Sequence, residues 1–410
     1  MSPLSDLGRR QIEDAAAAIA SAVAVTPLLD APRLAARIGA AQVCLKLENL
    51  QHSGSFKARG ALNRILALST DERGRGVVAM SAGNHAQGVA LHCGRLGIAA
   101  TIVMPCSTPL TKVRRTAAHG AEVVLAGDSL EQAQEQALDL ATRRGLTFIH
   151  PYDDPLVMAG QGTVGLEIAA QASALDDIVI PIGGGGLAAG IALAYAGRPT
   201  PRLTGVQSAS FATLAQGAPS VPASAQTLAE GIAVKHPGRL TRPIIEQRFD
   251  SVLAVDDGAI EQAIVWLTEE HKLVAEGAGA APVALLLTRP ELFAGRKVAV
   301  VISGGNIDNR VMASILMRGL VRDGRLARLR IEIGDAPGML ARATALIADH
   351  GGNILEVHHQ RLFQDVPVKN AELDVVVEAG DSSHVEAMLA ALSQAGFPAR
   401  HLASKAGLPE

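Results

Sequence analysis

Short apolar runs alternate with longer alanine-rich segments over most of the chain. A first set of runs lies at 43–47, 77–80, 100–104, 123–126 and 148–150, and a second set at 178–182, 203–206, 252–255 and 298–302. Segments such as 84–96 and 129–144 separate the runs and have the composition of helices. Continuous apolar runs between helices are typical of parallel strands that are buried on both faces. The pattern therefore predicts an α/β protein with two open, doubly wound sheets.

The pattern changes near residue 320. The polar stretch at 321–327 predicts a linker, and strict alternation at 328–333 indicates a half-exposed strand. Further elements follow: a helix from 339 to 347, strands at 353–357 and 372–378, a helix at 385–392 and a short strand at 398–402. The order βαββαβ predicts a ferredoxin-like domain at 328–410, after a larger domain at 1–320 whose smaller subdomain spans about 50–150.

Composition excludes several classes of function. Aromatic residues are 2% and hydrophobic residues 48% of the 410 residues, so the core must consist of small aliphatic side chains. The net charge of -3 offers no basic surface for nucleic acid. Three cysteines without metal-like spacing indicate free thiols in a reducing compartment, and the adjacent His358 and His359 point to opposite faces of a strand, so we predict no metal site. Without a secretory signal or a membrane-spanning stretch, we expect a cytoplasmic protein with no membrane partner.

The octapeptide at 53–60 places Lys57 among small residues, directly after an apolar run. Small residues let a bulky group approach the backbone closely. An amine held in a dry pocket there loses proton affinity and can form a Schiff base with an aldehyde. A turn with an ordinary surface lysine explains the octapeptide equally well, so the other motifs must decide.

A glycine loop lies between the apolar run at 178–182 and the helix that follows, and it consists of Gly183, Gly184, Gly185, Gly186 and Leu187. The backbone N–H groups of such a loop can turn toward one point, where the helix dipole adds positive potential. The loop therefore predicts a phosphate cradle, which we prefer to a flexible connection. It is neither a Walker A loop nor a dinucleotide fingerprint, because the spacing and the Lys-Ser/Thr pair are missing.

Small polar residues also follow two other predicted strands. The stretch after residue 80 offers backbone N–H groups for a carboxylate and consists of Ser81, Ala82, Gly83, Asn84 and His85. Alternatively, Ser81 or Asn84 only caps the next helix. Ser303 and two glycines follow the run at 298–302, and Glu276 is the one carboxylate of a small-residue stretch at 275–279.

Together these motifs resemble the fold type II pyridoxal-phosphate enzymes, in their serine/threonine dehydratase branch. Four motifs match in order over residues 5–320: Ser-x-Lys at 55–57, Ser-Ala-Gly-Asn-His at 81–85, the tetraglycine loop, and Ser-Gly-Gly-Asn at 303–306. The C-terminal unit resembles an ACT domain. The single ACT domain is similar to the arrangement in threonine dehydratases (threonine ammonia-lyases) of medium length.

The resemblance implies specific roles around a pyridoxal 5′-phosphate cofactor. Lys57 would bind the cofactor covalently, with Phe56 against its ring, and Glu276 would also contact it. Asn84 would hydrogen-bond the ring hydroxyl, Ser303 would face the ring nitrogen, and the loop from Gly183 to Leu187 would bind the phosphate. The substrate carboxylate would lie against Ser81, Ala82, Gly83, Asn84 and His85.

The resemblance also implies a reaction: deamination of L-threonine to 2-oxobutanoate and ammonia, with L-serine converted more slowly to pyruvate. The similar serine racemases carry a serine where this chain has Ala82, so we expect elimination and not racemisation. They also carry acidic metal ligands where this chain has Gln207 and Thr213, which disfavours magnesium and leaves a monovalent cation open. Two alternatives remain open: another β-eliminase, synthase or racemase-like enzyme, and an amino-acid sensor on an inactive scaffold.

An ACT domain implies allosteric control by an amino acid, with isoleucine as the expected inhibitor of a biosynthetic enzyme. The matching effector residues are Asp335, Pro337, Gly338, Met339, Leu340 and Asn353. ACT domains commonly pair, so we expect a homodimer or homotetramer. A purely structural oligomerisation module is the alternative.

Overall fold

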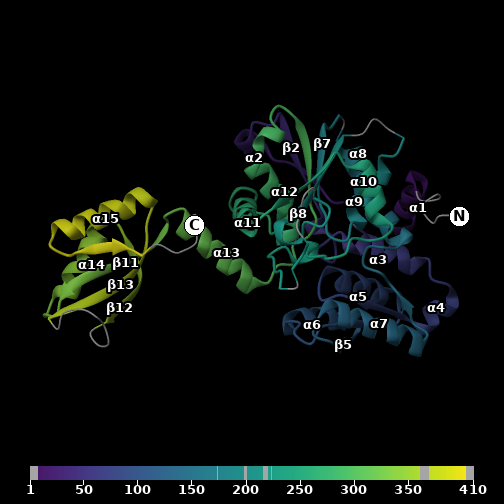
Figure 1. The fold of residues 1–410 in the computed structure, drawn as a ribbon, viewed down its shortest axis with the longest axis horizontal. Helices are drawn as coiled ribbons and strands as arrows, with labels where there is room; N and C mark the ends of the chain where they lie inside the picture. Colours follow the sequence, from purple (N-terminus) through teal and green to yellow (C-terminus); the bar gives the residue numbers. More distant parts are fainter. Residues whose placement is uncertain are drawn as a thin grey trace. The chain divides into compact units, whose positions relative to one another are not determined.

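The computed structural model describes residues 8–172, 174–197, 201–215, 220–222, 224–360 and 369–402. The chain forms two compact units, Met1–Ile307 and Asp308–Glu410 (Figure 1). In the described part of the chain, no helix combines the length and the apolar character needed to cross a membrane.

The larger sheet of the first unit has six strands, and all neighbours are parallel except β1 and β2. In spatial order they are β1 (Leu28–Asp30), β2 (Gln42–Leu47), β10 (Lys297–Ile302), β7 (Asp177–Pro181), β8 (Arg202–Ser208) and β9 (Ser251–Val255). Figure 1 shows helices on both faces of this sheet. One group comprises α2 (Pro32–Ile38), α11 (Asp257–His271) and α12 (Gly277–Thr288), and the other α1 (Arg9–Ile19), α8 (Pro155–Gln171), α9 (Gly186–Ala194) and α10 (Thr241–Arg248).

The smaller sheet is parallel and has the order β5 (Glu122–Leu125), β4 (Ala100–Met104), β3 (Val77–Met80) and β6 (Thr147–Phe148). Its helices are α3 (Lys57–Leu66), α4 (Thr70–Arg75), α5 (Asn84–Leu96), α6 (Leu110–Ala117) and α7 (Leu130–Arg144). The short 3-10 helices of the first unit are η1 (Glu48–Leu50), η2 (Ala209–Phe211), η3 (Glu230–Ile232) and η4 (Pro290–Leu292). The two open, doubly wound sheets confirm the predicted fold class.

The grouping of the strands differs from the sequence pattern in one respect. Residues 43–47 belong to the first set of runs in the sequence, yet β2 pairs with β10 in the larger sheet. Strand β1, which was not predicted, covers the other edge of β2 as an antiparallel neighbour. Chain order alone does not determine which sheet a buried strand joins, because the apolar pattern of β2 fits either sheet.

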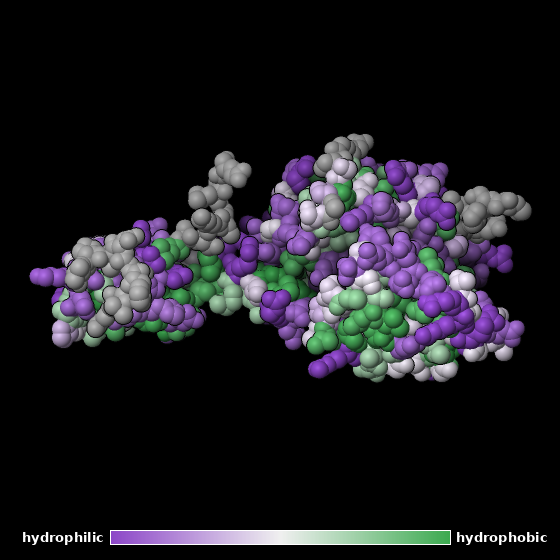
Figure 2. All heavy atoms as spheres, turned by 60° about the horizontal axis from the view of Figure 1, so that its bottom comes forward, coloured by the Kyte–Doolittle hydropathy of each residue, from purple (hydrophilic) through white to green (hydrophobic). Residues whose placement is uncertain are grey.

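Figure 2 brings the smaller subdomain forward and shows a largely hydrophilic surface that includes a broad apolar area. Exposed apolar side chains in this subdomain include Leu96, Leu110, Leu125, Leu130 and Leu138. Its interior core, by contrast, consists mainly of Ala, Val and Ile side chains from the sheet, α3 and α5. The core composition matches what the low aromatic content required.

The second unit begins with α13 (Asn309–Arg322) and continues as a four-stranded antiparallel sheet with two helices. Its elements are β11 (Leu326–Gly334), α14 (Met339–Asp349), β12 (Asn353–Gln360), β13 (Asn370–Glu378), α15 (Ser382–Gln394) and β14 (Ala399–His401). The order βαββαβ agrees with the prediction. The linker predicted at 321–327 shrinks to the turn at 323–325, because α13 continues to Arg322 and β11 starts at Leu326. The compact units also divide at 307, ahead of α13, and not at 320.

Candidate active site

The loops after β2 and β10 meet at the carboxyl edge of the larger sheet. The two strands are parallel neighbours, so their following loops leave the sheet at the same edge. The backbone N–H of Phe56 donates to the carbonyl oxygen of Ser303 at 3.1 Å, and that of Gly305 donates to Gly54 at 2.9 Å. These bonds join the lysine motif to the Ser-Gly-Gly-Asn motif, although the two are far apart in the sequence.

Lys57 is the first residue of α3, and its side chain is half-buried. Its Nζ donates to the carbonyl oxygen of Pro151 at 2.7 Å and lies 5.2 Å from the centre of the Phe56 ring. Burial lowers the pKa of Lys57 to about 8, against the opposing effect of the Glu276 carboxylate. The amine is therefore far easier to deprotonate than an ordinary surface lysine.

The glycine loop is shaped by its neighbours as well as by its own freedom. The Thr241 hydroxyl donates to the carbonyl oxygen of Gly184 at 2.6 Å, which fixes the orientation of that carbonyl. Gly185, with φ +92°, is the N-cap of α9, so the N–H groups of the next three residues have no acceptor within the helix. These N–H groups form the positive end of α9, as the phosphate-cradle prediction requires.

Pro151 and Tyr152 connect the amine to the glycine loop. Pro151 accepts the hydrogen bond from Lys57, and the ring of the next residue, Tyr152, packs directly on Gly184. A Cβ on Gly184 would lie 2.3 Å from that ring, so no larger residue fits there. The Tyr152 hydroxyl in turn donates to the carbonyl of His236 at 3.1 Å. Sequence reasoning missed this segment, because an isolated Pro-Tyr pair has no specific pattern.

Three polar side chains form a chain across the site. Asn306 Nδ2 donates to Asn84 Oδ1 at 2.7 Å, and Asn84 Nδ2 donates to Glu276 Oε1 at 2.6 Å. Burial raises the pKa of Glu276 to about 7, while the hydrogen bond from Asn84 acts in the opposite direction. The structure thus brings together Asn84 and Glu276, which the sequence analysis named separately, and adds Asn306.

The stretch at 81–85 presents backbone N–H groups at the start of α5. The N–H of Gly83 donates to the Ser81 hydroxyl at 3.1 Å, and α5 begins at Asn84. A Cβ on Gly83 would meet no atom within 4 Å, so the space beside it is open. The His85 ring, however, is buried with Nε2 at 3.0 Å from the Ile149 carbonyl, and burial lowers its pKa to about 3. His85 can therefore serve a bound carboxylate only through its backbone.

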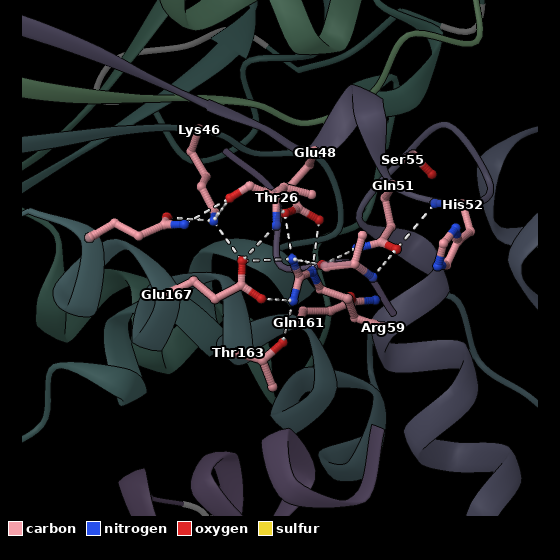
Figure 3. Close-up of polar contacts among 12 residues, drawn as sticks. Thr26, Lys46, Glu48, Gln51, His52, Ser55, Arg59, Gln161, Thr163 and Glu167 are labelled. Carbon is pink, nitrogen blue, oxygen red and sulfur yellow. Dashed lines mark hydrogen bonds and ion pairs between the residues drawn. The ribbon is translucent and has the colours of Figure 1, made fainter. Parts of the chain in front are cut away.

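A buried ionic cluster holds the first turn of α3 in place, and sequence reasoning missed it (Figure 3). Arg59 contacts Glu48 at 2.7 Å and Glu167 at 2.6 Å, and Lys46 also contacts Glu167 at 2.6 Å. Although burial favours the neutral form, the two carboxylates hold the pKa of Arg59 above its ordinary value. Because Arg59 lies two residues after Lys57, the cluster fixes the helix that carries the reactive amine.

These residues fit a cofactor that carries both a phosphate and an aldehyde. The glycine loop supplies N–H donors, Lys57 supplies an amine of lowered pKa, and the Ser55 hydroxyl is buried without a hydrogen-bond partner among the described residues. The family model described as "pyridoxal-phosphate dependent enzyme" matches residues 19–304. The chain belongs to this family. A second model, the ACT domain, matches residues 327–397 of the enzyme.

Curated relatives of this pyridoxal-phosphate dependent enzyme align over most of both chains. An L-threonine ammonia-lyase of Thermotoga maritima is 44% identical over 88% of this chain and 90% of its own length. One of Geobacter sulfurreducens is 42% identical over 87% and 90%, respectively. Among solved structures, the processed form of threonine deaminase isoform 2 from Solanum lycopersicum has a TM-score of 0.70 at 33% identity, covering 75% of this chain and 87% of its own. Maize serine racemase has a TM-score of 0.70 at 32% identity, covering 77% and 98%.

The ACT domain of the enzyme contains a cavity of about 300 Å³ at the start of α14. Of the six residues predicted to bind an effector, four line it, namely Asp335, Pro337, Gly338 and Leu340. Met339 and Asn353 do not line it, and Asn353 instead donates to Glu378 at 3.1 Å. His359 also lines the cavity, although the sequence analysis considered it only as a metal ligand.

In the segment considered for a cation, the side-chain amide of Gln207 makes two hydrogen bonds to residues of the same segment. Gln207 is buried, its Nε2 donates to the Thr213 hydroxyl at 3.2 Å, and its Oε1 accepts from the N–H of Leu214 at 2.8 Å. Across the residues that the structure describes, no group of three or more His, Cys, Asp or Glu side chains is arranged to hold a metal ion.

Proposed function

We propose that the enzyme deaminates L-threonine to 2-oxobutanoate and ammonia: water leaves across Cα and Cβ, and one water is taken up again when the resulting imine hydrolyses. We propose that it acts more slowly on L-serine to give pyruvate and ammonia. The observation that carries this proposal is the match to two L-threonine ammonia-lyases over 88% and 87% of the chain. Both alignments cover more of the chain than the first compact unit, Met1–Ile307, contains. They therefore extend into the second unit.

The cofactor, when bound, supplies the electron sink for charge that develops at the substrate Cα. Lys57, freed by the incoming amino acid, takes the proton from Cα, because its lowered pKa makes the neutral amine available near neutral pH. The N–H groups after Gly185 would hold the phosphate, and Asn84, which also donates to Glu276, would hold the ring hydroxyl. Phe56 would pack against the ring, Glu276 would contact the cofactor, and Ser303 would face the ring nitrogen.

The substrate carboxylate binds to the backbone N–H groups at the start of α5. Ser81 and Gly83 form a tight turn there, and the space beside Gly83 is open. Ala82 has no hydroxyl to act at the opposite face of Cα, so elimination is favoured over racemisation.

Racemisation is the second candidate because solved racemases share the fold. Besides the maize enzyme, serine racemase from Dictyostelium discoideum has a TM-score of 0.68 at 30% identity. Chiral analysis of the recovered amino acid separates the two reactions. Substrate profiling similarly separates threonine dehydration from other β-eliminations, because Lys57 would serve all of them.

An amino acid, for which isoleucine is the first choice, is proposed to bind the cavity that Asp335, Pro337, Gly338 and Leu340 line. The cavity volume of about 300 Å³ suits a small amino acid. Association into a homodimer or homotetramer is part of the same proposal, because ACT domains commonly pair.

The decisive experiment is a keto-acid assay with threonine and with serine, each with and without isoleucine. We expect the wild type to form 2-oxobutanoate from threonine and the Lys57→Ala variant to form none. Borohydride reduction should attach the cofactor covalently to the wild type but not to this variant. Absence of keto acid from a fully cofactor-loaded enzyme would reject the proposal and favour the amino-acid sensor. Deletion of residues 326–410 should abolish the isoleucine response and leave turnover in place.

A further inference from the structure

Asn306 lies on the loop after β10, and its side-chain amide touches two other motifs of the site. Asn306 Nδ2 lies 2.8 Å from the carbonyl oxygen of Ser53 and 2.7 Å from Asn84 Oδ1. It also packs tightly against the lysine loop, because a Cβ on Gly54 would lie 2.6 Å from Asn306 Oδ1. Gly54 has φ +71°, which favours glycine at this contact for a second reason. Asn306 therefore has little freedom to reorient.

Ser53, Asn306, Asn84 and Glu276 form a hydrogen-bonded series, and the groups at its two ends determine which atom donates in each bond. A backbone carbonyl can only accept, so the atom of Asn306 that faces Ser53 must be the amide nitrogen. That same nitrogen faces Asn84, which must therefore present its oxygen to Asn306 and its nitrogen to Glu276. The carboxylate oxygen at the far end accepts, in agreement with this order.

We propose that Asn306 is a positioning residue that fixes the amide orientation of Asn84. One N–H of Asn84 goes to Glu276, and the orientation leaves its second N–H for the ring oxygen of the cofactor. Asn306 acts through Asn84 and touches neither the cofactor nor the substrate. The inference rests on the proposed cofactor role of Asn84, but not on which amino acid is the substrate.

An aspartate at position 306 tests the polarity of the chain with almost no change in shape. Asn306→Asp places carboxylate oxygens against the Ser53 carbonyl and Asn84 Oδ1, which repel them. Asn84 relieves the repulsion by rotating its amide, and its oxygen then faces Glu276 and the ring oxygen. Asn306→Ala only removes hydrogen bonds, including the one to Asn84 Oδ1. Asn84 can therefore keep its native orientation through its hydrogen bond to Glu276.

The experiment uses the full-length holoenzyme and measures the dissociation constant of pyridoxal 5′-phosphate by equilibrium dialysis, together with the absorbance spectrum of the bound cofactor. We expect Asn306→Asp to weaken cofactor binding about tenfold and Asn306→Ala about threefold, since a reversed polar contact costs more than a missing one. The spectrum should shift in Asn306→Asp. In an Asn84→Ala background, either change at 306 should have almost no further effect, because residues that act through one another are not additive.

Asn63→Asp is the matched control. Asn63 is a buried amide on α3 that donates to the carbonyl of Leu156 at 2.8 Å, outside the hydrogen-bonded series of Asn306, Asn84 and Glu276. We expect its cofactor affinity and spectrum to remain as in the wild type, even where its thermal stability falls. The inference is overturned if Asn306→Ala is at least as harmful as Asn306→Asp, or if the effects at 84 and 306 add. Neither readout involves a substrate, so a failure to deaminate threonine would leave this result intact.

Discussion

Lys57 donates a hydrogen bond to the carbonyl oxygen of Pro151 at 2.7 Å, in a setting that also lowers its pKa to about 8. The bond holds the amine beside the segment whose next residue, Tyr152, packs on the glycine loop. A protonated amine donates readily to a carbonyl but cannot attack an aldehyde. Loss of the Lys57 proton therefore both weakens this contact and activates the nucleophile.

The rate of cofactor attachment to the cofactor-free protein should rise with pH and level off above about pH 8. The midpoint of this rise gives the pKa of the Lys57 amine, which is 10.5 for an ordinary lysine. Glu276→Gln removes the negative charge that opposes the lowering, so the midpoint should move to lower pH. Stopped-flow absorbance over about pH 6 to 11.5 measures both profiles. A midpoint near 10.5 would show that burial does not tune this amine.

Glu276 should also make stability depend on pH in the cofactor-free protein. Its pKa rises from 4.5 in the unfolded chain to about 7 in the fold, so the native state holds the extra proton between these values. The stability gained from this protonated carboxyl is complete below pH 4.5 and is lost as the pH rises to about 7. The contribution of Lys57 to stability changes with pH in the opposite direction. Because its pKa is lowered in the fold, stability increases as the pH rises from about 8 to 10.5.

Urea unfolding of the wild type and Glu276→Gln at a series of pH values tests the Glu276 contribution. The difference in free energy of unfolding, wild type minus variant, should fall between pH 4.5 and about 7 and then stay flat. A difference that rises over this range would mean that the fold favours the carboxylate and not the acid.

Arg59→Ala should destabilise the enzyme by about 3 to 5 kcal/mol, because it leaves Glu48 and Glu167 buried without their cation. Arg242→Ala is the matched control. Arg242 forms an exposed pair with Glu246 within α10, and its loss should cost less than about 1 kcal/mol. Chemical denaturation of both variants gives the comparison, and equal losses would show that the buried cluster is not needed for stability.

Local patterns predicted the elements because each one carries its own signal. The apolar runs that became β3, β4 and β7 are buried throughout, and the alternation at 328–333 reappears as buried Leu329, Ile331 and Ile333 on β11. The partner of β2 could not be predicted, because its pairing with β10 depends on contacts between distant segments. The end of α13 was missed because Arg322 runs directly into the polar residues at 323–325, so that the whole stretch resembles a linker in sequence.

The site shows the same division between local and distant information. Lys57, the glycine loop and Asn84 each stand in a local motif, so the sequence indicated them individually. Arg59 was overlooked because a charged residue on a helix is usually exposed, and its carboxylate partners lie on other elements. Pro151 contributes only a backbone carbonyl, which every residue type carries, and so it leaves no signature in the sequence.

The cavity of the ACT domain can be tested by two leucine substitutions one helical turn apart on α14. Ala341 lines the cavity of about 300 Å³, whereas Ala345 is exposed and does not line it. Ala341→Leu should partly fill the cavity and weaken the isoleucine response about tenfold, while basal turnover stays unchanged. Ala345→Leu should respond as the wild type does, since both changes add the same apolar volume to the same helix. Turnover measured against isoleucine concentration decides the matter, and a wild-type response in both variants would place the effector elsewhere.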